Sequence, residues 1–187
     1  MKADRIYNAS AEPISLAEAK MHSRVDSTDD DEIIRLYIAA AREYVENWSG
    51  TAIVESTYAF YFDIWQSEYN IYKPINSITT FEYKNADNVG VYGGSLTGSD
   101  YHYNSSQGLI TLGNSVMTDI YNQSNAVKIT AVVGQENIGE IRSDVKQAML
   151  LMIGHWYENR EEVSVVQLHQ IPMGAKDLLA SVRDHRI

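Results

Sequence analysis

A short stretch late in the chain, HWYENREE, carries the residue types best suited to chemistry. His155, Glu158 and Glu162 are spaced i, i+3 and i+7, so a helix would bring them to one face. One histidine and two carboxylates on one face could ligate a metal and support a metal-dependent hydrolase. Such sites need matched ligands from a second helix, and the helix expected at residues 31–48 has no histidine. The sequence therefore favours the alternative, in which this stretch is the polar end of a structural helix.

The acidic run DSTDDDE has the composition of a calcium-binding loop but not its order. If Asp26 takes the first position, Asp31 takes the sixth, where glycine is required, and Tyr37 takes the twelfth, where glutamate is required. Acidic residues at the start of a helix interact favourably with its dipole. The run is therefore interpreted as the beginning of a helix.

Two further motifs are too incomplete to indicate an active site. Ser143 to Lys146 fits S-x-x-K, but the companion motifs of that class of enzyme are missing. The glycine-rich stretch at 90–98 has no following Lys-Ser/Thr and no helix after it, so it is interpreted as a hairpin tip or loop rather than a phosphate cradle. The sequence predicts no catalytic, cofactor-binding or metal-binding residues, and we expect no enzymatic activity.

Composition and charge narrow the class of protein. The chain has 187 residues, 44% of them hydrophobic and 21% charged, which is typical of a globular protein. It has no cysteine, so disulfides and thiolate metal sites are excluded. Its apolar runs are too short to span a bilayer, and no membrane partner is expected. The net charge is −10 and the basic residues are scattered, which argues against a phosphate-gripping groove. An acidic wall can still surround DNA that passes without binding.

The first fifty residues show helical periodicity. Ser15 and Glu18 form an S-x-x-E capping box that predicts a short helix, SLAEAKMHSRV. A second helix begins in STDDDE, runs to about Trp48 and ends at Gly50. Its predicted buried stripe has six central residues and three that widen it: Ile33, Tyr37, Ala40, Ala41, Tyr44 and Trp48, then Ile34, Ile38 and Val45.

Residues 55–134 change to a period of two, which predicts strands. TYAFYFDIW places Tyr58, Phe60, Phe62 and Ile64 on one face, and SITTFEYK, YHYN, LITL and AVKITAVV alternate similarly. Turn-forming clusters separate these runs. We expect a small antiparallel sheet or barrel of about five or six strands.

Helical periodicity returns at Ser143, which is predicted to be an N-cap. The stripe that follows consists of Val145, Ala148, Met149, Met152, Ile153 and Trp156. A last short helix, at about 174–183, follows Pro172. The fold class is therefore predicted as α+β: helices at 13–50 and 143–187 form a small bundle, with a β insertion at about 55–134, in a single domain over 1–187.

The chain as a whole resembles the head–tail connector, or adaptor, proteins of long-tailed bacteriophages and prophages. The resemblance lies in P-x-S-L-x-E-A-K at Pro13, AAREYVE at Ala40, KPINSITTFEY, GLITL, AVKITAVVG, and KQAMLLMIGHWYENREEV followed by IPMGAKDLLASVR. Ala131 departs from a common aromatic, and Val182 stands where tyrosine is frequent. These differences affect packing more than the resemblance.

The resemblance implies a structural, non-enzymatic virion protein that lies at the head–tail interface, and in the host cytoplasm during assembly. Such proteins form a homo-oligomeric ring, commonly of twelve subunits, that docks on the portal protein and extends the DNA channel. The ring is a platform for a neck, stopper or tail-completion protein, and DNA passes through it without sequence-specific binding. The residues implied in subunit or portal contacts are Trp156, Tyr157, Arg160, Pro172, Leu178, Leu179 and Arg183.

Two other functions remain open from the residues alone. One is a DNA-packaging accessory protein, and the other is a metal-dependent hydrolase that uses His155, Glu158 and Glu162. Without the resemblance, the pattern indicates only an α+β interaction protein.

Overall fold

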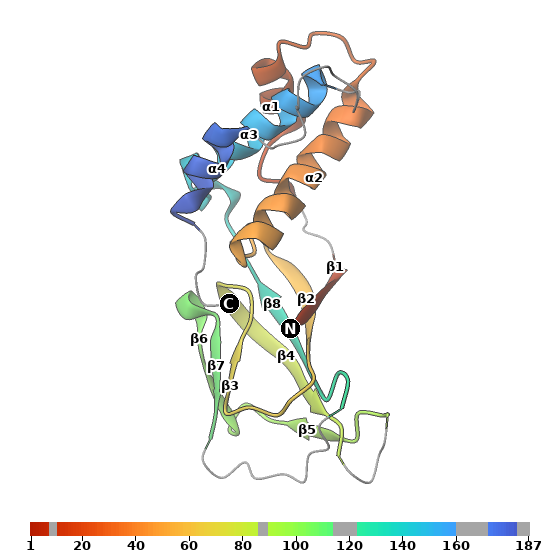
Figure 1. Ribbon diagram of the computed structural model, residues 1–187, viewed down its shortest axis with the longest axis vertical. Helices are drawn as coiled ribbons and strands as arrows, with labels where there is room; N and C mark the ends of the chain where they lie inside the picture. The colour runs from red at the N-terminus through yellow and green to blue at the C-terminus, as the bar shows by residue number, and fades with distance from the viewer. Residues whose placement is uncertain (8–10, 86–89, 114–122, 160–171, 183–187) are drawn as a thin grey trace. The chain divides into compact units, whose positions relative to one another are not determined.

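The computed structural model describes residues 1–7, 11–85, 90–113, 123–159 and 172–182 (Figure 1). The predicted α+β class is confirmed: helices accompany antiparallel sheets, and the described strands form open sheets rather than a closed barrel. The chain divides into two compact units. The β unit comprises Met1–Ser10 and Glu55–Gly134, and the helical unit comprises Ala11–Val54 and Gln135–Ile187.

Within the described residues, the helical unit contains four α-helices. They are α1 (Leu16–Ser23), α2 (Asp31–Ser49), α3 (Ser143–Glu158) and α4 (Met173–Ala180), with a 3-10 turn η2 (Ile138–Glu140) before α3. Helix α3 contacts each of the other three, so it forms the centre of this unit. Its buried residues Val145, Ala148, Met149, Met152 and Ile153 confirm the predicted stripe, while Trp156 is half-buried.

Local signals set the ends of the first two helices as predicted. The Ser15 hydroxyl accepts a hydrogen bond from the Glu18 amide at 3.2 Å, and the Glu18 carboxylate accepts one from the Ser15 amide at 2.8 Å. These reciprocal bonds complete the capping box of α1. Helix α2 ends at Gly50, whose φ of 66° is the left-handed conformation that glycine adopts without strain.

Two details of the helices differ from the prediction. The fully buried apolar row of α2 consists of Ile34, Ile38, Ala41 and Val45. Of the six residues expected at the centre only Ala41 is buried, and the others, such as Tyr37 and Tyr44, are half-buried. Both rows are apolar, and only the helices packed against α2 decide which one lies deeper. Ser143 is the first residue of α3 and not its N-cap, because Arg142 precedes the helix and Asp144 bonds the Val145 amide at 2.9 Å.

Eight strands in the described part of the β unit form two antiparallel sheets. The strands are β1 (Lys2–Tyr7), β2 (Ser56–Phe62), β3 (Glu68–Asn70), β4 (Ile75–Tyr83), β5 (Gly94–Leu96), β6 (Tyr101–Asn104), β7 (Leu109–Leu112) and β8 (Val127–Val133), with a 3-10 turn η1 (Ser105–Gln107). The order is β1-β2-β8-β4-β5 in one sheet and β3-β7-β6 in the other. The count exceeds the five or six strands expected, since β3 and β5 are too short to show periodicity and β1 is an edge strand.

Aromatic side chains join the two sheets of the β unit. Phe62 of β2 meets Tyr69 of β3 with ring centroids 4.8 Å apart, and Phe81 of β4 stacks on Tyr101 of β6 at 5.7 Å. Tyr69 and Phe81 are buried at 0% and 1% exposure. Ile64, which was expected to continue the buried face of β2, lies beyond the end of the strand and is 54% exposed.

One glycine interpreted as part of a hairpin tip or loop belongs to a strand. Gly94 is the first residue of β5 and pairs with Tyr83 of β4. The Tyr83 ring occupies the space that a Cβ at position 94 would need. Gly94 is therefore a close-approach position within the sheet.

Candidate functional site

The two aromatics predicted as contact residues lie at the C-terminal end of α3. The Trp156 ring is 6.1 Å from the Tyr37 ring of α2, and the Tyr157 hydroxyl donates to an Asp30 carboxylate oxygen at 2.7 Å. Both side chains are half-buried. They fasten the end of α3 to the beginning of α2 and still keep part of their surface accessible.

The predicted contact residues near α4 have different environments. Pro172 directly precedes the helix, and its carbonyl accepts a hydrogen bond from the Ala175 amide at 2.9 Å. Leu178 is half-buried, but Leu179 is 0% exposed and belongs to the core of the helical unit. In the single chain the Leu179 side chain is therefore fully engaged in packing within the helical unit. Arg160 and Arg183 lie outside the described residues.

The stretch considered for metal chemistry is only partly described. His155 is half-buried, Glu158 is exposed, and Glu162 lies outside the described residues. The Asn159 side-chain nitrogen donates to the His155 carbonyl at 2.9 Å and lies 3.4 Å from Nδ1 of the His155 ring. Among the residues that the structure describes, no group of three or more potential ligands is placed to hold a metal ion.

A buried charge network in α2 escaped the sequence analysis. Arg42 and Glu46 are 3% and 1% exposed. Arg42 Nε donates to Glu12 Oε2 at 2.7 Å, Nη2 to Glu12 Oε1 at 3.2 Å, and Nη1 to Glu46 Oε2 at 3.1 Å. Burial by itself would lower the pKa of Arg42, but the hydrogen bond to Glu12 and the charge of Glu46 outweigh it and raise that pKa. The i, i+4 spacing of Arg42 and Glu46 was visible in the sequence, but it is common on solvated helix faces.

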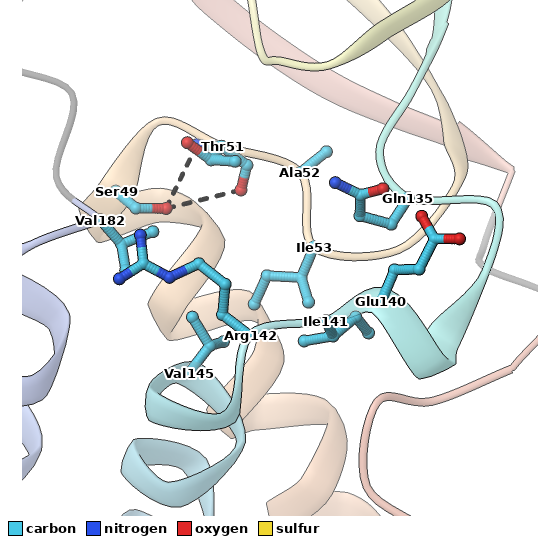
Figure 2. A pocket seen from close by; sticks show the side chains of 10 residues that line it. All are labelled: Ser49, Thr51, Ala52, Ile53, Gln135, Glu140, Ile141, Arg142, Val145 and Val182. Carbon is cyan, nitrogen blue, oxygen red and sulfur yellow. Dashed lines mark hydrogen bonds between the residues drawn. The ribbon is translucent and has the colours of Figure 1, made fainter. Parts of the chain in front are cut away.

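A small apolar pocket lies in the helical unit where α2 ends and α3 begins (Figure 2). In Figure 2 the side chains of Ile53, Ile141 and Val145 lie close together, with Arg142 and Glu140 on opposite sides of them. The pocket volume is about 80 Å³. Pockets for drug-sized ligands measure roughly 300–1,000 Å³, so this one has room for a single side chain rather than a substrate.

Large apolar side chains are exposed on each unit. On the helical unit Met21 is 76% exposed, Leu36 60% and Met173 77%. Met21 also lines a shallow concavity along α1 with Leu16, Ala17, Lys20, Val25 and Asp26. On the β unit, the edge strand β1 and its flank carry Met1, Ile6 and Tyr7 at 45% exposure or more.

Charge is unevenly divided between the units. The helical unit contains 17 acidic and 10 basic residues, and the β unit contains 8 and 5. Lys84 and Lys128 of the β unit lie over the Tyr92 ring at 5.2 and 5.6 Å, but Lys128 is paired with Glu82 at 3.0 Å. Lys84 also donates to the Ser124 carbonyl at 3.0 Å, so both lysines are engaged within the β unit. None of the described helices has the length and apolar character needed to cross a bilayer.

Known proteins share both the sequence pattern and the fold. Head completion proteins match this chain over residues 12–167, and no curated protein matches it. Several solved structures match, and three of them do so at 17% sequence identity, covering 100% of this chain and 97% of the other. They are the neck of an empty gene transfer agent (GTA) particle computed with C6 symmetry, the virion of a native GTA particle, and the neck of a native GTA particle computed with C12 symmetry, with TM-scores of 0.76, 0.72 and 0.70. Because the family match spans most of the sequence, the chain belongs to the head completion protein family.

Proposed function

We propose that this protein is a structural component of the virion, a head–tail connector that docks on the portal and provides the platform for neck or tail attachment. The observation that carries the proposal is the family match over residues 12–167. The fold supports it, since similar chains occur in the necks of phage-like GTA particles.

The connector acts as a homo-oligomeric ring, and twelve is the subunit number we expect. The C6 and C12 symmetries of the similar neck structures support a ring. In a closed ring each subunit uses two different, complementary faces. Met21, Leu36 and Met173 on the helical unit, and the flank of β1 on the β unit, supply exposed apolar surface for such contacts.

The residues at the ends of α3 and α4 contribute to these contacts in our proposal. Trp156, Tyr157, Pro172 and Leu178 keep accessible surface, and Arg160 and Arg183 remain in the proposed set on the strength of the sequence. The neighbours are a second copy of this chain, the portal protein, and a downstream neck, stopper or tail-completion protein.

DNA is conducted by this ring and is not gripped by it. The net charge of −10 supports this role, because a wall with an excess of negative charge does not hold a polyanion. A DNA-packaging accessory that binds DNA would instead retain a duplex at low salt and release it steeply as salt rises. A gel shift with purified protein distinguishes the two, and we expect no retention at any salt concentration.

The protein works through contacts and has no enzymatic activity in our proposal. The competing metal-dependent hydrolase requires His155, Glu158 and Glu162 to hold an ion. Elemental analysis of the purified protein, with a His155→Ala variant as comparison, tests that alternative directly. A stoichiometric metal that the variant loses would favour the hydrolase.

Deletion of the gene tests the connector role. We expect heads with a portal but without attached tails, and we expect the purified protein to bind purified portal. Complementation with the intact gene restores tailed particles and serves as the control. Tailed, infectious particles of normal composition after deletion would refute the proposal.

A further inference from the structure

The small pocket of the helical unit has the size and lining that suit one aliphatic side chain. Its walls come from the end of α2 and the segment after it, from the turn before α3, and from Val182 after α4. Its volume is about 80 Å³, and its apolar lining includes Ala52, Ile53, Ile141 and Val145 (Figure 2). Burying an aliphatic side chain against such a lining is favourable, because it removes apolar surface from water.

Buried polar groups hold the wall of this pocket in one geometry. Glu46 is 1% exposed and accepts a hydrogen bond from the Ile53 amide at 3.0 Å, and Arg42 binds the same carboxylate at 3.1 Å. The Ser49 hydroxyl accepts a further bond from the Thr51 amide at 3.2 Å. The pocket is therefore preformed, and a side chain that enters it does so without the cost of ordering the wall.

Leu36 has the position and the surroundings of a side chain that inserts into a neighbouring molecule. It is 60% exposed and, at 3.6 residues per turn, lies on the side of α2 opposite the buried row. The next turn on that side carries only Ala39 and Ala40, so a partner surface can approach the leucine closely. Leu36 is thirteen residues before Ser49, about 20 Å along the helix axis, so it cannot fill the pocket of its own chain.

The other large apolar side chains exposed on the described helical unit, Met21 and Met173, fit this role less well. A heterologous ring contact places the inserting residue and the receiving pocket on different sides of the subunit. Met173 begins α4 and Val182 of the pocket follows that helix, so both belong to one short segment. Met21 lines a shallow concavity along α1, which is a surface that receives a side chain. Leu36, on the outer side of α2, meets the requirement.

The charges beside Leu36 and beside the pocket are complementary in one orientation. Glu32 lies one turn before Leu36 and Arg35 directly before it, with 90% and 53% of their side chains exposed. Glu140 and Arg142 lie on opposite sides of the pocket (Figure 2). When Glu32 faces Arg142 and Arg35 faces Glu140, both contacts are attractive, whereas the reverse orientation brings like charges together twice.

We propose that Leu36 of one subunit inserts into this pocket of the next, so that the occupant of the pocket is a second copy of this chain. The inference rests on the ring of the proposed connector function and concerns contacts between helical units only. Each subunit then supplies both the inserting residue and the pocket, and the contact repeats head to tail around the ring.

Disulfide trapping of the portal-bound protein tests this pairing. The chain has no cysteine, so cysteines introduced at Leu36 and at Val182, which lines the pocket, are its only thiols. We expect oxidation of the Leu36→Cys/Val182→Cys variant with diamide to give a ladder of covalent oligomers, detected through a tag on this chain, because every neighbour is linked. A mixture of the two single variants is expected to stop at dimers, and either single variant alone to give none.

Met21→Cys/Val182→Cys is the matched control, because Met21 is an exposed apolar residue of the same unit. We expect this pair to assemble on the portal and to give no ladder. Circular dichroism checks the folding of each variant. If Val182→Cys fails to fold, Thr51→Cys supplies the thiol of the pocket instead, since Thr51 also lines it.

Charge reversal tests the orientation of the contact. Glu140→Arg, added to the Leu36→Cys/Val182→Cys variant, turns the attraction to Arg35 of the neighbour into repulsion, and we expect the yield of the ladder to fall about tenfold. Arg35→Glu in the same chain is expected to restore it. A yield that the second change does not restore would contradict the orientation.

The outcomes separate this inference from the function on which it rests. A portal-bound ring that gives no ladder overturns the inference and leaves the connector function intact, as does an equal ladder from the Met21→Cys/Val182→Cys control. Absence of any portal-bound ring in co-sedimentation contradicts the connector proposal and, with it, the inference.

Discussion

At the scale of single residues, the most constrained positions are those where the backbone itself meets a neighbour. Gly108 follows η1 with a φ of 67°, and a Cβ there would collide with the Ile71 carbonyl oxygen. Its amide also bonds the Asn104 carbonyl at 3.0 Å, which closes the turn between β6 and β7. A turn cluster in the sequence indicated this turn, but the collision partner comes from a segment more than thirty residues away.

Gly108→Ala is expected to destabilise the protein by about 2 kcal/mol or more, because it adds left-handed strain to a steric clash. Chemical denaturation measures the loss. Gly98→Ala is the matched control, since no atom lies within 4 Å of its added Cβ and its φ is not positive. A loss at position 98 equal to that at position 108 would contradict the explanation.

Tyr69 gives a residue-scale prediction in alkaline solution. Burial raises its pKa to about 12, although the bond from the Gln66 amide acts in the opposite direction. The unfolded chain loses this proton near pH 10 and the folded chain near 12, so Tyr69 stabilises the fold below pH 10 and that contribution is lost as the pH rises through 12. A pH titration that follows both tyrosinate absorbance and unfolding measures this effect. Tyr69→Phe should remove one tyrosine that titrates above pH 10. Titration of every tyrosine near pH 10 in the folded protein would refute it.

At the scale of elements, helix ends and buried faces were the best predicted features of the chain. Caps depend on contacts within four residues, so the capping box at Ser15 and the glycine at 50 could be identified from sequence. The N-terminus of α3 was only partly predictable, because Asp144 is held by the nearby Arg142 and also by Ser181, which only the fold brings to it. Its carboxylate accepts from Arg142 at 2.5 and 3.1 Å and from the Ser181 hydroxyl at 3.2 Å.

The beginning of α3 therefore responds to Asp144 and not to Ser143. We expect Asp144→Ala to cost about 1 kcal/mol and Ser143→Ala to be close to neutral. The hydrogen bond from Arg142 lowers the pKa of Asp144, so its contribution is present at neutral pH and is lost as the pH falls through the acidic range. Chemical denaturation of the two variants at pH 7 and pH 3 measures these costs, and we expect the cost of Asp144→Ala to be larger at pH 7. A larger loss for Ser143→Ala would restore the serine as the cap.

At the scale of the whole molecule, the ring contacts that we propose use the accessible apolar residues. Leu36 lies on α2 outside the buried row and is 60% exposed. Leu36→Glu is expected to leave folding unchanged and to abolish ring formation on the portal, because a charge cannot be buried unpaired in a subunit contact. Gln147→Glu adds the same charge at an exposed position of α3 and is expected to assemble normally. Circular dichroism and co-sedimentation with portal measure both properties; assembly of the Leu36→Glu ring would remove this residue from the proposed contacts.

Some parts of the proposed contact region could be predicted from sequence. The end of α3 was identified from its pattern, and the structure adds that Trp156 and Tyr157 reach Tyr37 and Asp30, residues more than a hundred positions away. Leu179 could not be assigned from sequence, since a leucine on a short helix is equally compatible with a core and with a surface. The Arg42 network was missed because an i, i+4 ion pair on a helix is usually exposed, and its burial here depends on distant segments of the chain.

The sequence by itself determined the alternation of helical and extended segments, the acidic charge, and the pattern that places the chain among head completion proteins. These properties follow from local backbone preferences and from composition. The tertiary structure decided which row of α2 lies deepest, that the N-terminal strand joins the β unit, that Arg42 bonds Glu12, and that Asn76 bonds the Gly134 carbonyl. Each of these depends on groups far apart in the chain meeting in space, where burial and hydrogen-bond geometry select among patterns that are locally equivalent.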